Sequence, residues 1–223
     1  MRALLLFDID KTLIIGKYRD GWPTAAALKS VFGRELEVTL VPTDGLTDRE
    51  IVWRILQANQ IKDLITEDLM DQVLYNLIIE FEKRLNSYEI TVLPETKESL
   101  SFLEKENFLL GLVTGNCERI AQLKLTKADL WQHFSFGGFG GHSRDRSTLV
   151  LEAIKKAKDL HGFYNPAQTF VIGDTPNDIH AGIKAGVRTI GVATGIFSKE
   201  ELLQAGSERV FDHIVGVRES LRD

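Results

Sequence analysis

The chain has 223 residues, enough for one to two domains, and its 43% hydrophobic and 26% charged residues are an ordinary globular balance that argues against disorder. Its net charge of -5 argues against a broad nucleic-acid surface, which needs a basic stripe, and no apolar run is long enough to cross a bilayer. A single cysteine excludes an intrachain disulfide and "ALLLF" is too short for a signal peptide, so we expect a cytoplasmic protein, monomer or homodimer, with no nucleic-acid or membrane partner.

Four short apolar runs are the predicted core strands. They are "ALLLF" before Asp8, "LLGLV" before Thr114, "TFVI" before Gly173-Asp174 and "RTIGV" before Ala193. Each is too short for a helix and rich in Leu, Val and Ile, as is typical of a strand buried on both faces. Helical patterns separate the runs. This alternation predicts an α/β fold with a doubly wound parallel sheet, in which ligands bind at the carboxyl ends of the strands.

The stretch from residue 16 to residue 87 interrupts the alternation. Three helical patterns follow one another there: "WPTAAALKSVFG", "TDREIVWRILQAN" and the segment from Thr66 to Arg84. We therefore expect an inserted α-helical domain at residues 16–87. Residues 1–15 and 88–223 would then form the catalytic core.

Two acids follow the first predicted strand directly, in "DIDKT". Asp8 and Asp10 repel each other unless a cation or a shared proton separates them. Simple capping of a turn is one interpretation. A calcium loop of the EF-hand kind fails, because Leu13 stands where a glycine is needed and Arg19 where the bidentate Glu is needed. The third interpretation is a magnesium site for phosphoryl transfer with one carboxylate as the nucleophile.

A second pair of acids follows the third predicted strand, in "VIGDTPND". Asp174 and Asp178 are one helical turn apart, and together with Asp8 and Asp10 they place four carboxylates at the mouth of one sheet. Mg²⁺ prefers oxygen ligands and usually keeps waters, which leaves room for a substrate phosphate. The four acids therefore favour a magnesium site.

An anion-binding segment is predicted at "LVTGN", residues 112–116. Thr114 supplies a hydroxyl, and Gly115 and Asn116 bring backbone N–H groups to the start of a helix. Such groups bind phosphate through direct hydrogen bonds and the helix dipole. We therefore expect these three residues to contact the substrate.

The motifs "DIDKT", "LVTGN" and "GDTPND" resemble motifs I, II and IV of the haloacid dehalogenase superfamily of phosphohydrolases, from Asp8 through Asp178. The three helices after motif I are similar to the C1-type helical cap of that family, and the nearest subgroup resembles phosphoglycolate phosphatase. The resemblance implies a magnesium-dependent phosphatase that hydrolyses a small soluble phosphomonoester through an aspartyl-phosphate intermediate. A phosphomutase of the same superfamily and a non-catalytic binding protein on the same fold are the alternatives.

The resemblance also implies a role for each motif residue. Asp8 attacks the phosphorus, and Asp10 protonates the leaving oxygen and later activates the water, while its backbone carbonyl binds Mg²⁺. Thr114 hydrogen-bonds the phosphoryl oxygens. Asp174 completes the metal site, and Asp178 supports it through water or hydrogen bonds.

The chain departs from the family pattern at two places. Lys11 stands where relatives often carry glycine, and "GHSRDRSTLVLEAI" has no lysine before its helix, where motif III usually supplies one. We expect Arg146 to provide that cation, with Arg144 as the second candidate and Lys155 as the next. An arginine can clamp phosphate with two hydrogen bonds. A solvated loop is the alternative for both arginines.

Residues that select the substrate are expected in the helical insertion. The candidates are Thr43 and Arg49 in "VPTDGLTDR" and residues 17–19 near the first connection, with ordinary hinge and helix-cap roles as the alternative. "GGFGG" at residues 137–141 lacks the third glycine of a dinucleotide fingerprint, because Ser143 occupies that place. We interpret it as a flexible turn.

Overall fold

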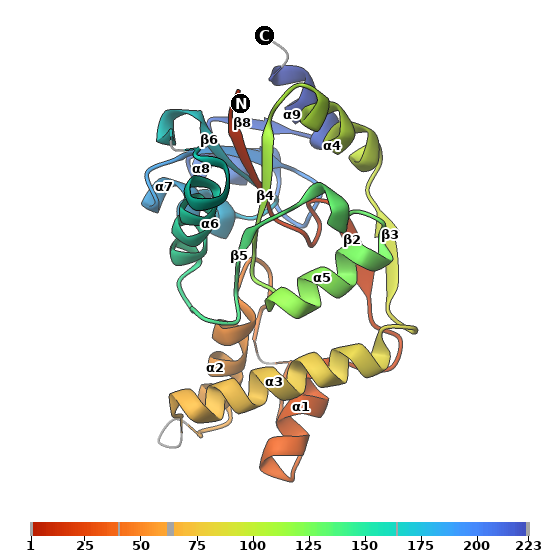
Figure 1. The fold of residues 1–223 in the computed structure, drawn as a ribbon. Helices are drawn as coiled ribbons and strands as arrows, with labels where there is room; N and C mark the ends of the chain where they lie inside the picture. Colours follow the sequence, from red (N-terminus) through yellow and green to blue (C-terminus); the bar gives the residue numbers. More distant parts are fainter. Residues whose placement is uncertain (1, 40, 62–64, 164, 222–223) are drawn as a thin grey trace.

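A six-stranded parallel sheet forms the centre of the computed structural model, which describes residues 2–39, 41–61, 65–163 and 165–221 (Figure 1). All neighbouring strands in this sheet run parallel. In spatial order the strands are β5 (Gly137–Phe139), β4 (Leu109–Thr114), β1 (Leu4–Phe7), β6 (Thr169–Gly173), β7 (Arg188–Val192) and β8 (Arg209–Phe211). The predicted α/β fold with a doubly wound parallel sheet is confirmed.

Helices cover both faces of this sheet. One face carries α4 (Thr96–Lys105), α5 (Glu118–Lys127) and α9 (Ile214–Ser220), and the other carries α6 (Arg146–His161) and α7 (Pro176–Lys184). Shorter elements complete the core: α8 (Lys199–Gln204), η2 (Trp131–His133) and η3 (Pro166–Gln168). Successive side chains of β1 alternate between the faces, so that Leu5 and Phe7 join the cluster of α4, α5 and α9, whereas Leu4 and Leu6 join that of α6 and α7. Burial on both faces explains the unbroken apolar run.

Four of the six strands lie where the sequence predicts them, whereas β5 and β8 were not predicted. The stretch interpreted as a flexible turn contains the buried edge strand Gly137–Phe139, which pairs with β4. A Cβ on Gly138 would lie 1.9 Å from the carbonyl oxygen of Leu149, so only glycine allows α6 to pack this closely. Glycine is rare in strand interiors. The glycines that allow β5 to pack closely therefore give this strand the composition of a turn, which explains the wrong prediction.

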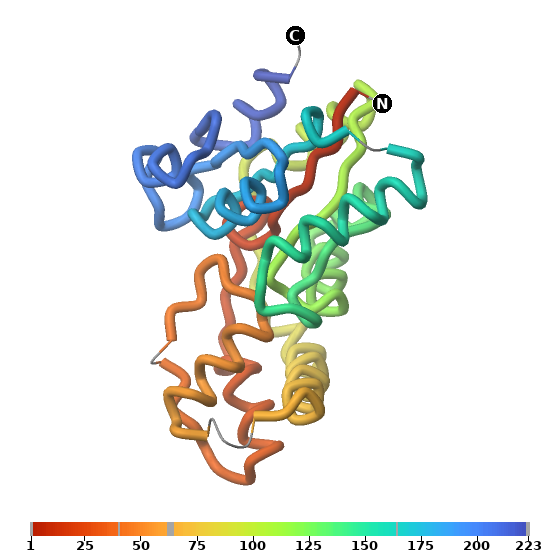
Figure 2. Tube along the Cα trace, turned by 90° about the vertical axis from the view of Figure 1, so that its left-hand side faces the viewer, coloured from red at the N-terminus to blue at the C-terminus, as the bar shows by residue number. Residues whose placement is uncertain are grey.

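Three helices lie beyond the carboxyl ends of the core strands, at the lower end of the molecule in Figure 2. They are α1 (Pro23–Phe32), α2 (Asp48–Ala58) and α3 (Glu67–Arg84). Apolar residues such as Leu28, Ile55 and Phe81 form a separate core between them. The three inserted helices are confirmed, whereas the division into a domain at residues 16–87 stays a prediction. None of the described helices, α3 included, has the length and apolar character needed to cross a membrane.

A two-stranded antiparallel ribbon connects these helices to the core (Figure 1). It pairs β2 (Ile14–Lys17) with β3 (Glu89–Val92), with Ile14 opposite Val92 and Lys17 opposite Glu89. The chain therefore enters the helical layer along β2 and leaves it along β3, so that both connections lie side by side.

Candidate active site

Three neighbouring strands bring their polar ends to one place. Asp8 follows β1, which lies between β4 and β6, so that it is flanked by Thr114 at the end of β4 and by Asp174 just after β6. The three residues are at most 6% exposed. Parallel strands end at the same edge of a sheet, and the crevice predicted from the sequence lies at this edge.

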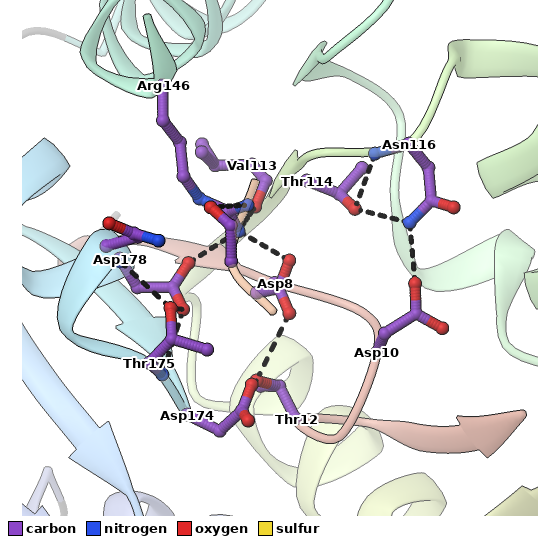
Figure 3. A network of polar contacts seen from close by, with 12 residues as sticks. Asp8, Asp10, Thr12, Val113, Thr114, Asn116, Arg146, Asp174, Thr175 and Asp178 are labelled. Atoms are coloured by element: carbon purple, nitrogen blue, oxygen red, sulfur yellow. Dashed lines mark hydrogen bonds and ion pairs between the residues drawn. The ribbon is translucent and has the colours of Figure 1, made fainter. Parts of the chain in front are cut away.

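Asp8, Asp174 and Asp178 form a buried acidic cluster (Figure 3). One carboxylate oxygen from each lies within 4.8 Å of the others. Asp178 lies in the first turn of α7, where the N–H and hydroxyl of Thr175 donate to its Oδ2 at 3.1 and 2.7 Å. Asp178 Oδ1 and Asp174 Oδ2 are buried without a hydrogen-bond donor. Asp178 Oδ1 lies in ion contact with Arg146, whereas no ion pair or hydrogen bond of the described residues reaches Asp174 Oδ2, so the partner that this buried oxygen needs can be a divalent cation.

The raised pKa values of two of these carboxylates also favour a bound cation. Burial raises the pKa of Asp8 to about 7, against the lowering effect of Arg146, and the charges of Asp178 and Asp10 add to the rise. Burial and the charges of Asp8 and Asp178 raise the pKa of Asp174 to about 8. Asp8 and Asp174 therefore resist full ionisation at neutral pH unless further positive charge is present. A bound Mg²⁺ would supply that charge.

Arg146 reaches into the cluster from the first residue of α6. Its Nη2 lies 2.6 Å from Asp8 Oδ1, to which it donates a hydrogen bond, and 2.5 Å from Asp178 Oδ1, an ion contact without hydrogen-bond alignment. It also donates to the carbonyl of Val113 at 3.3 Å. Burial would lower the pKa of Arg146, but the charges of Asp178 and Asp8 outweigh it, and the pKa is raised. The guanidinium therefore stays charged beside the expected nucleophile.

The other two candidates for this cation lie elsewhere. Arg144 stacks on the ring of Trp53, with its guanidinium carbon 4.1 Å from the ring centre, and lies 3.8 Å from Glu50. Lys155 is exposed on α6. The structure thus brings Arg146 to Asp8, while its catalytic role stays a prediction.

Asp10 is turned away from the acidic cluster (Figure 3). Its carboxylate accepts hydrogen bonds from Lys124 Nζ at 2.6 and 2.8 Å and from Asn116 Nδ2 at 2.7 Å. Burial would raise the pKa of Asp10, but Lys124 and Asn116 outweigh it and lower the pKa. The side chain is therefore not among the clustered carboxylates, and a contribution of the Asp10 carbonyl to the metal site stays a prediction.

Lys124 is a site residue that the sequence analysis missed. It is 4% exposed on α5, and Asp10 holds its pKa well above the usual value despite the burial. Its Nζ also donates to Asn116 Oδ1 at 2.8 Å. Ile120 and Lys124 are four residues apart on α5, so they share the buried side of the helix. The four-residue spacing between Lys124 and the apolar Ile120 is the sequence feature that could have indicated a buried lysine.

The predicted anion-binding segment is partly occupied by the helical layer. Asn116 N–H lies 3.3 Å from Thr114 Oγ1, to which it donates, and Cys117 N–H donates to Asp48 Oδ2 at 2.7 Å. A Cβ on Gly115 would lie 2.1 Å from the carbonyl oxygen of Leu46. The backbone N–H groups of Asn116 and Cys117 are therefore already paired, and Thr114, Gly115 and the Asn116 side chain remain along the cavity.

A cavity of about 460 Å³ lies between the core and the inserted helices. Asp8, Asp10 and Thr114 line it from the core, and Thr43 lines it from the inserted segment. Their roles in binding the substrate stay predictions. Arg49 does not reach the cavity. The guanidinium of Arg49 is bound instead by Glu67, by Asp71 at 2.7 Å and by the carbonyl of Gly141 at 3.1 Å, which are contacts that hold α2, α3 and the core together.

Lys11 closes the core side of this cavity. It has a φ of 63°, in the left-handed region that glycine tolerates best, which accounts for the glycine that relatives often carry here. Its ammonium contacts the carboxylate of Asp44 on the inserted segment. The substitution by lysine therefore adds an ion pair between the core and the helical layer.

The family model described as haloacid dehalogenase-like hydrolase matches residues 5–192, which include every motif described above. The chain belongs to this family. The curated phosphoglycolate phosphatase of Psychrobacter arcticus is 26% identical over 226 residues, covering 95% of this chain and 92% of that protein. The predicted resemblance and the predicted enzyme class, a phosphatase-type hydrolase, are thereby confirmed.

Solved structures show that the haloacid dehalogenase-like fold extends over the whole chain. A hydrolase from Pseudomonas syringae aligns with a TM-score of 0.69 at 21% identity, covering 99% of this chain and 100% of that one. A β-phosphoglucomutase from Clostridium difficile aligns with a TM-score of 0.65 at 18% identity, covering 97% and 93%. At these identities the two likenesses establish the fold and leave the substrate open.

Proposed function

We propose that this hydrolase is a magnesium-dependent phosphatase that cleaves a small soluble phosphomonoester through an aspartyl phosphate on Asp8. One observation carries the proposal: Asp8 lies at a buried strand end, in a cluster of three carboxylates, with Arg146 Nη2 2.6 Å from its Oδ1. A carboxylate nucleophile for a phosphate dianion needs fixed positive charge on both sides, and this arrangement accommodates it.

In this proposal Asp8, Asp174 and Asp178 hold Mg²⁺, with the backbone carbonyl of Asp10 as a further ligand. The bound ion would neutralise charge on the carboxylates and on the transferred phosphoryl group. The buried Asp174 Oδ2, which accepts no hydrogen bond, supports this assignment. Arg146 would then balance the remaining charge between Asp8 and the phosphate.

The first half of the reaction transfers the phosphoryl group to the protein. A carboxylate oxygen of Asp8 attacks the phosphorus, and the bond from phosphorus to the leaving oxygen breaks. Asp10 takes up a proton when the phosphate dianion binds beside it, because a like charge raises its pKa, and it passes this proton to the leaving oxygen. Lys124 and Asn116 hold the Asp10 carboxylate in position for this transfer.

The second half regenerates the enzyme. Asp10, now ionised and kept so by Lys124, accepts a proton from a water molecule whose oxygen attacks the phosphorus. The bond between phosphorus and Asp8 breaks, which frees inorganic phosphate and the Asp8 carboxylate, and Asp10 loses its proton to solvent when the phosphate leaves. Residues 16–87 would act as a cap that covers the cavity during both steps. The cytoplasmic location and the state as a monomer or homodimer stay predictions.

A panel of phosphorylated metabolites tests the proposal directly. We expect Mg²⁺-dependent release of inorganic phosphate, and a phosphorylated protein that mass spectrometry detects after rapid acid quenching. The Asp8→Asn variant should lose both signals. Asp129→Asn changes an exposed acid that pairs with Lys97, and it should retain both. Isomerised sugar phosphate without phosphate release would support a phosphomutase, and no turnover of any compound would support the non-catalytic alternative.

A further inference from the structure

The inserted helices present an apolar wall to the cavity. Most of the described side chains that line the cavity from residues 15–77 are aliphatic or aromatic, and the others belong to threonines and to Asp44 and Asp48. The aliphatic and aromatic ones are Ile15, Tyr18, Trp22, Val38, Val41, Leu46, Ile51 and Leu77. They come from β2 and the residue after it, from all three inserted helices or their caps, and from the loop before α2. The part of the substrate that extends away from the core therefore meets a largely apolar surface.

The cationic side chains around the cavity already have acidic partners. Of the described residues, Lys11, Lys124 and Arg146 are the lysines and arginines that line it. Lys11 pairs with Asp44, and Lys124 pairs with Asp10. Arg146 pairs with both Asp8 and Asp178.

Among its described residues, the inserted segment adds acids to this lining and no cation. Asp44 and Asp48 both line the cavity, and Asp48 uses its Oδ2 to accept the Cys117 N–H. A second anionic group on the substrate, remote from the phosphate, would find no unpaired cation among these residues. On binding, this anionic group would lose its hydration and gain no ion pair in return, which is unfavourable.

Aromatic rings lie beside the proton donor. Lys124, which holds Asp10, lies 5.7 Å from the ring centre of Tyr88, and Tyr88 packs on Tyr18 with the ring centres 4.6 Å apart. Asp10 must approach the leaving oxygen to protonate it. The carbon attached to that oxygen is therefore directed toward Tyr18, Tyr88 and the apolar wall.

We infer that the substrate is a phosphomonoester whose leaving group is an uncharged, largely apolar or aromatic alcohol, and that a carboxylate-bearing leaving group such as glycolate is rejected. This inference rests on the proposed phosphatase activity. The cavity of about 460 Å³ holds a phosphate and a ring-sized group, since pockets of a few hundred Å³ bind molecules of that size.

A matched set of esters tests the inference. Benzyl phosphate, its para-carboxamide and its para-carboxylate have similar shapes and leaving oxygens, and they differ in the charge at the far end. We expect kcat/KM for the carboxamide to exceed that for the carboxylate by roughly tenfold or more, because the buried carboxylate would lack a partner. Phosphoglycolate should be a poorer substrate than benzyl phosphate.

A charge placed on the cavity wall provides the control. Thr39 lines the cavity from an exposed position, so Thr39→Lys adds a cation with little cost in folding, and Thr39→Gln adds length without charge. Thr39→Lys should raise the carboxylate-to-carboxamide ratio of kcat/KM by roughly threefold or more, the scale of a partly exposed ion pair. Thr39→Gln should leave that ratio as in the parent protein.

Each outcome separates the two claims. Release of phosphate with the carboxylate ester or phosphoglycolate as the preferred substrate overturns the inferred leaving group and leaves the phosphatase standing. A ratio that Thr39→Lys does not change also contradicts the charge argument. No phosphate from any ester, in a protein whose folding is verified by circular dichroism, overturns the proposed function itself.

Discussion

Replacing Arg146 by alanine is the most informative single change. Its Nη2 lies 2.6 Å from Asp8 Oδ1 and 2.5 Å from Asp178 Oδ1, so the change removes a fixed cation from two buried carboxylates. Losing one preorganised electrostatic contact costs a rate factor of roughly 10²–10³. Arg146 also lowers the pKa of Asp8, which lies at about 7 with the arginine present. Its loss leaves more Asp8 protonated and unable to attack, so we expect at least a hundredfold loss of kcat/KM at neutral pH.

The same change should be visible in folding. Removing one partner of a buried ion pair costs about 3–5 kcal/mol, because the remaining charge is left uncompensated. We expect a loss on this scale in the free energy of unfolding of the metal-free protein, measured by urea titration. Arg146→Lys should recover part of the activity, since lysine restores the charge without the fork of donors.

Arg144→Ala is the matched control for this change. Its guanidinium lies on Trp53 and 3.8 Å from Glu50, away from the carboxylate cluster, so the rate should stay within about twofold. A crippling Arg144→Ala beside a mild Arg146→Ala would refute the assignment. If neither change matters, the required cation comes from elsewhere, and Lys124 is then the first residue to test, ahead of Lys155.

Four further outcomes follow from the site. Asp8→Asn should abolish phosphate release while circular dichroism shows an intact fold, and full activity would end the mechanism. Chelation should stop turnover, and Ca²⁺ should restore it poorly, because its larger coordination sphere misplaces the reacting oxygens; a rate insensitive to chelator would refute the metal site. Without metal, Asp8 and Asp174 have a pKa raised to about 7 and about 8, so the folded state holds extra protons and their contribution to stability falls as pH rises from about 4 to about 8. Mg²⁺ should therefore raise the melting temperature more at pH 8 than at pH 5, and equal shifts would contradict this. Lys124→Met should reduce the rate by roughly tenfold or more and raise the pKa of Asp10 in the pH–rate profile, whereas an unchanged profile would show that Lys124 does not act through Asp10.

The parts of the site that could be predicted from the sequence are those marked by a short local pattern of residues. Asp8, Thr114 and Asp174 each follow an apolar run directly, and parallel strands bring such ends together whatever the rest of the chain does. The positions of these three residues follow from chain order and strand direction. Arg146 was expected on other grounds, because the resemblance implies a cation just before this helix and the segment has no lysine there.

The parts that the sequence did not predict depend on contacts between distant segments. Lys124 is 114 residues from Asp10 in the sequence, so no local pattern indicates that the two side chains meet. Lysine is also a common residue in helices, and its presence in α5 did not identify it as a site residue. Arg49 has a guanidinium group that could bind phosphate. In the folded protein this group is already hydrogen-bonded to acids on α3 and to the carbonyl of Gly141. Whether an arginine is free or already paired is decided by neighbours that no local pattern contains.

The ribbon of β2 and β3 makes the helical insertion separable by design. Lys17 and Glu89 are directly opposite each other in the antiparallel pairing, so deleting residues 18–88 leaves two chain ends one strand spacing apart. A two-residue Asn-Gly turn is the natural closure for such ends. The same geometry offers one point at which a different helical module could be joined to the core sheet. We expect such a module to leave the core intact only if it replaces the contacts that Asp48 and Arg49 make to Cys117 and Gly141.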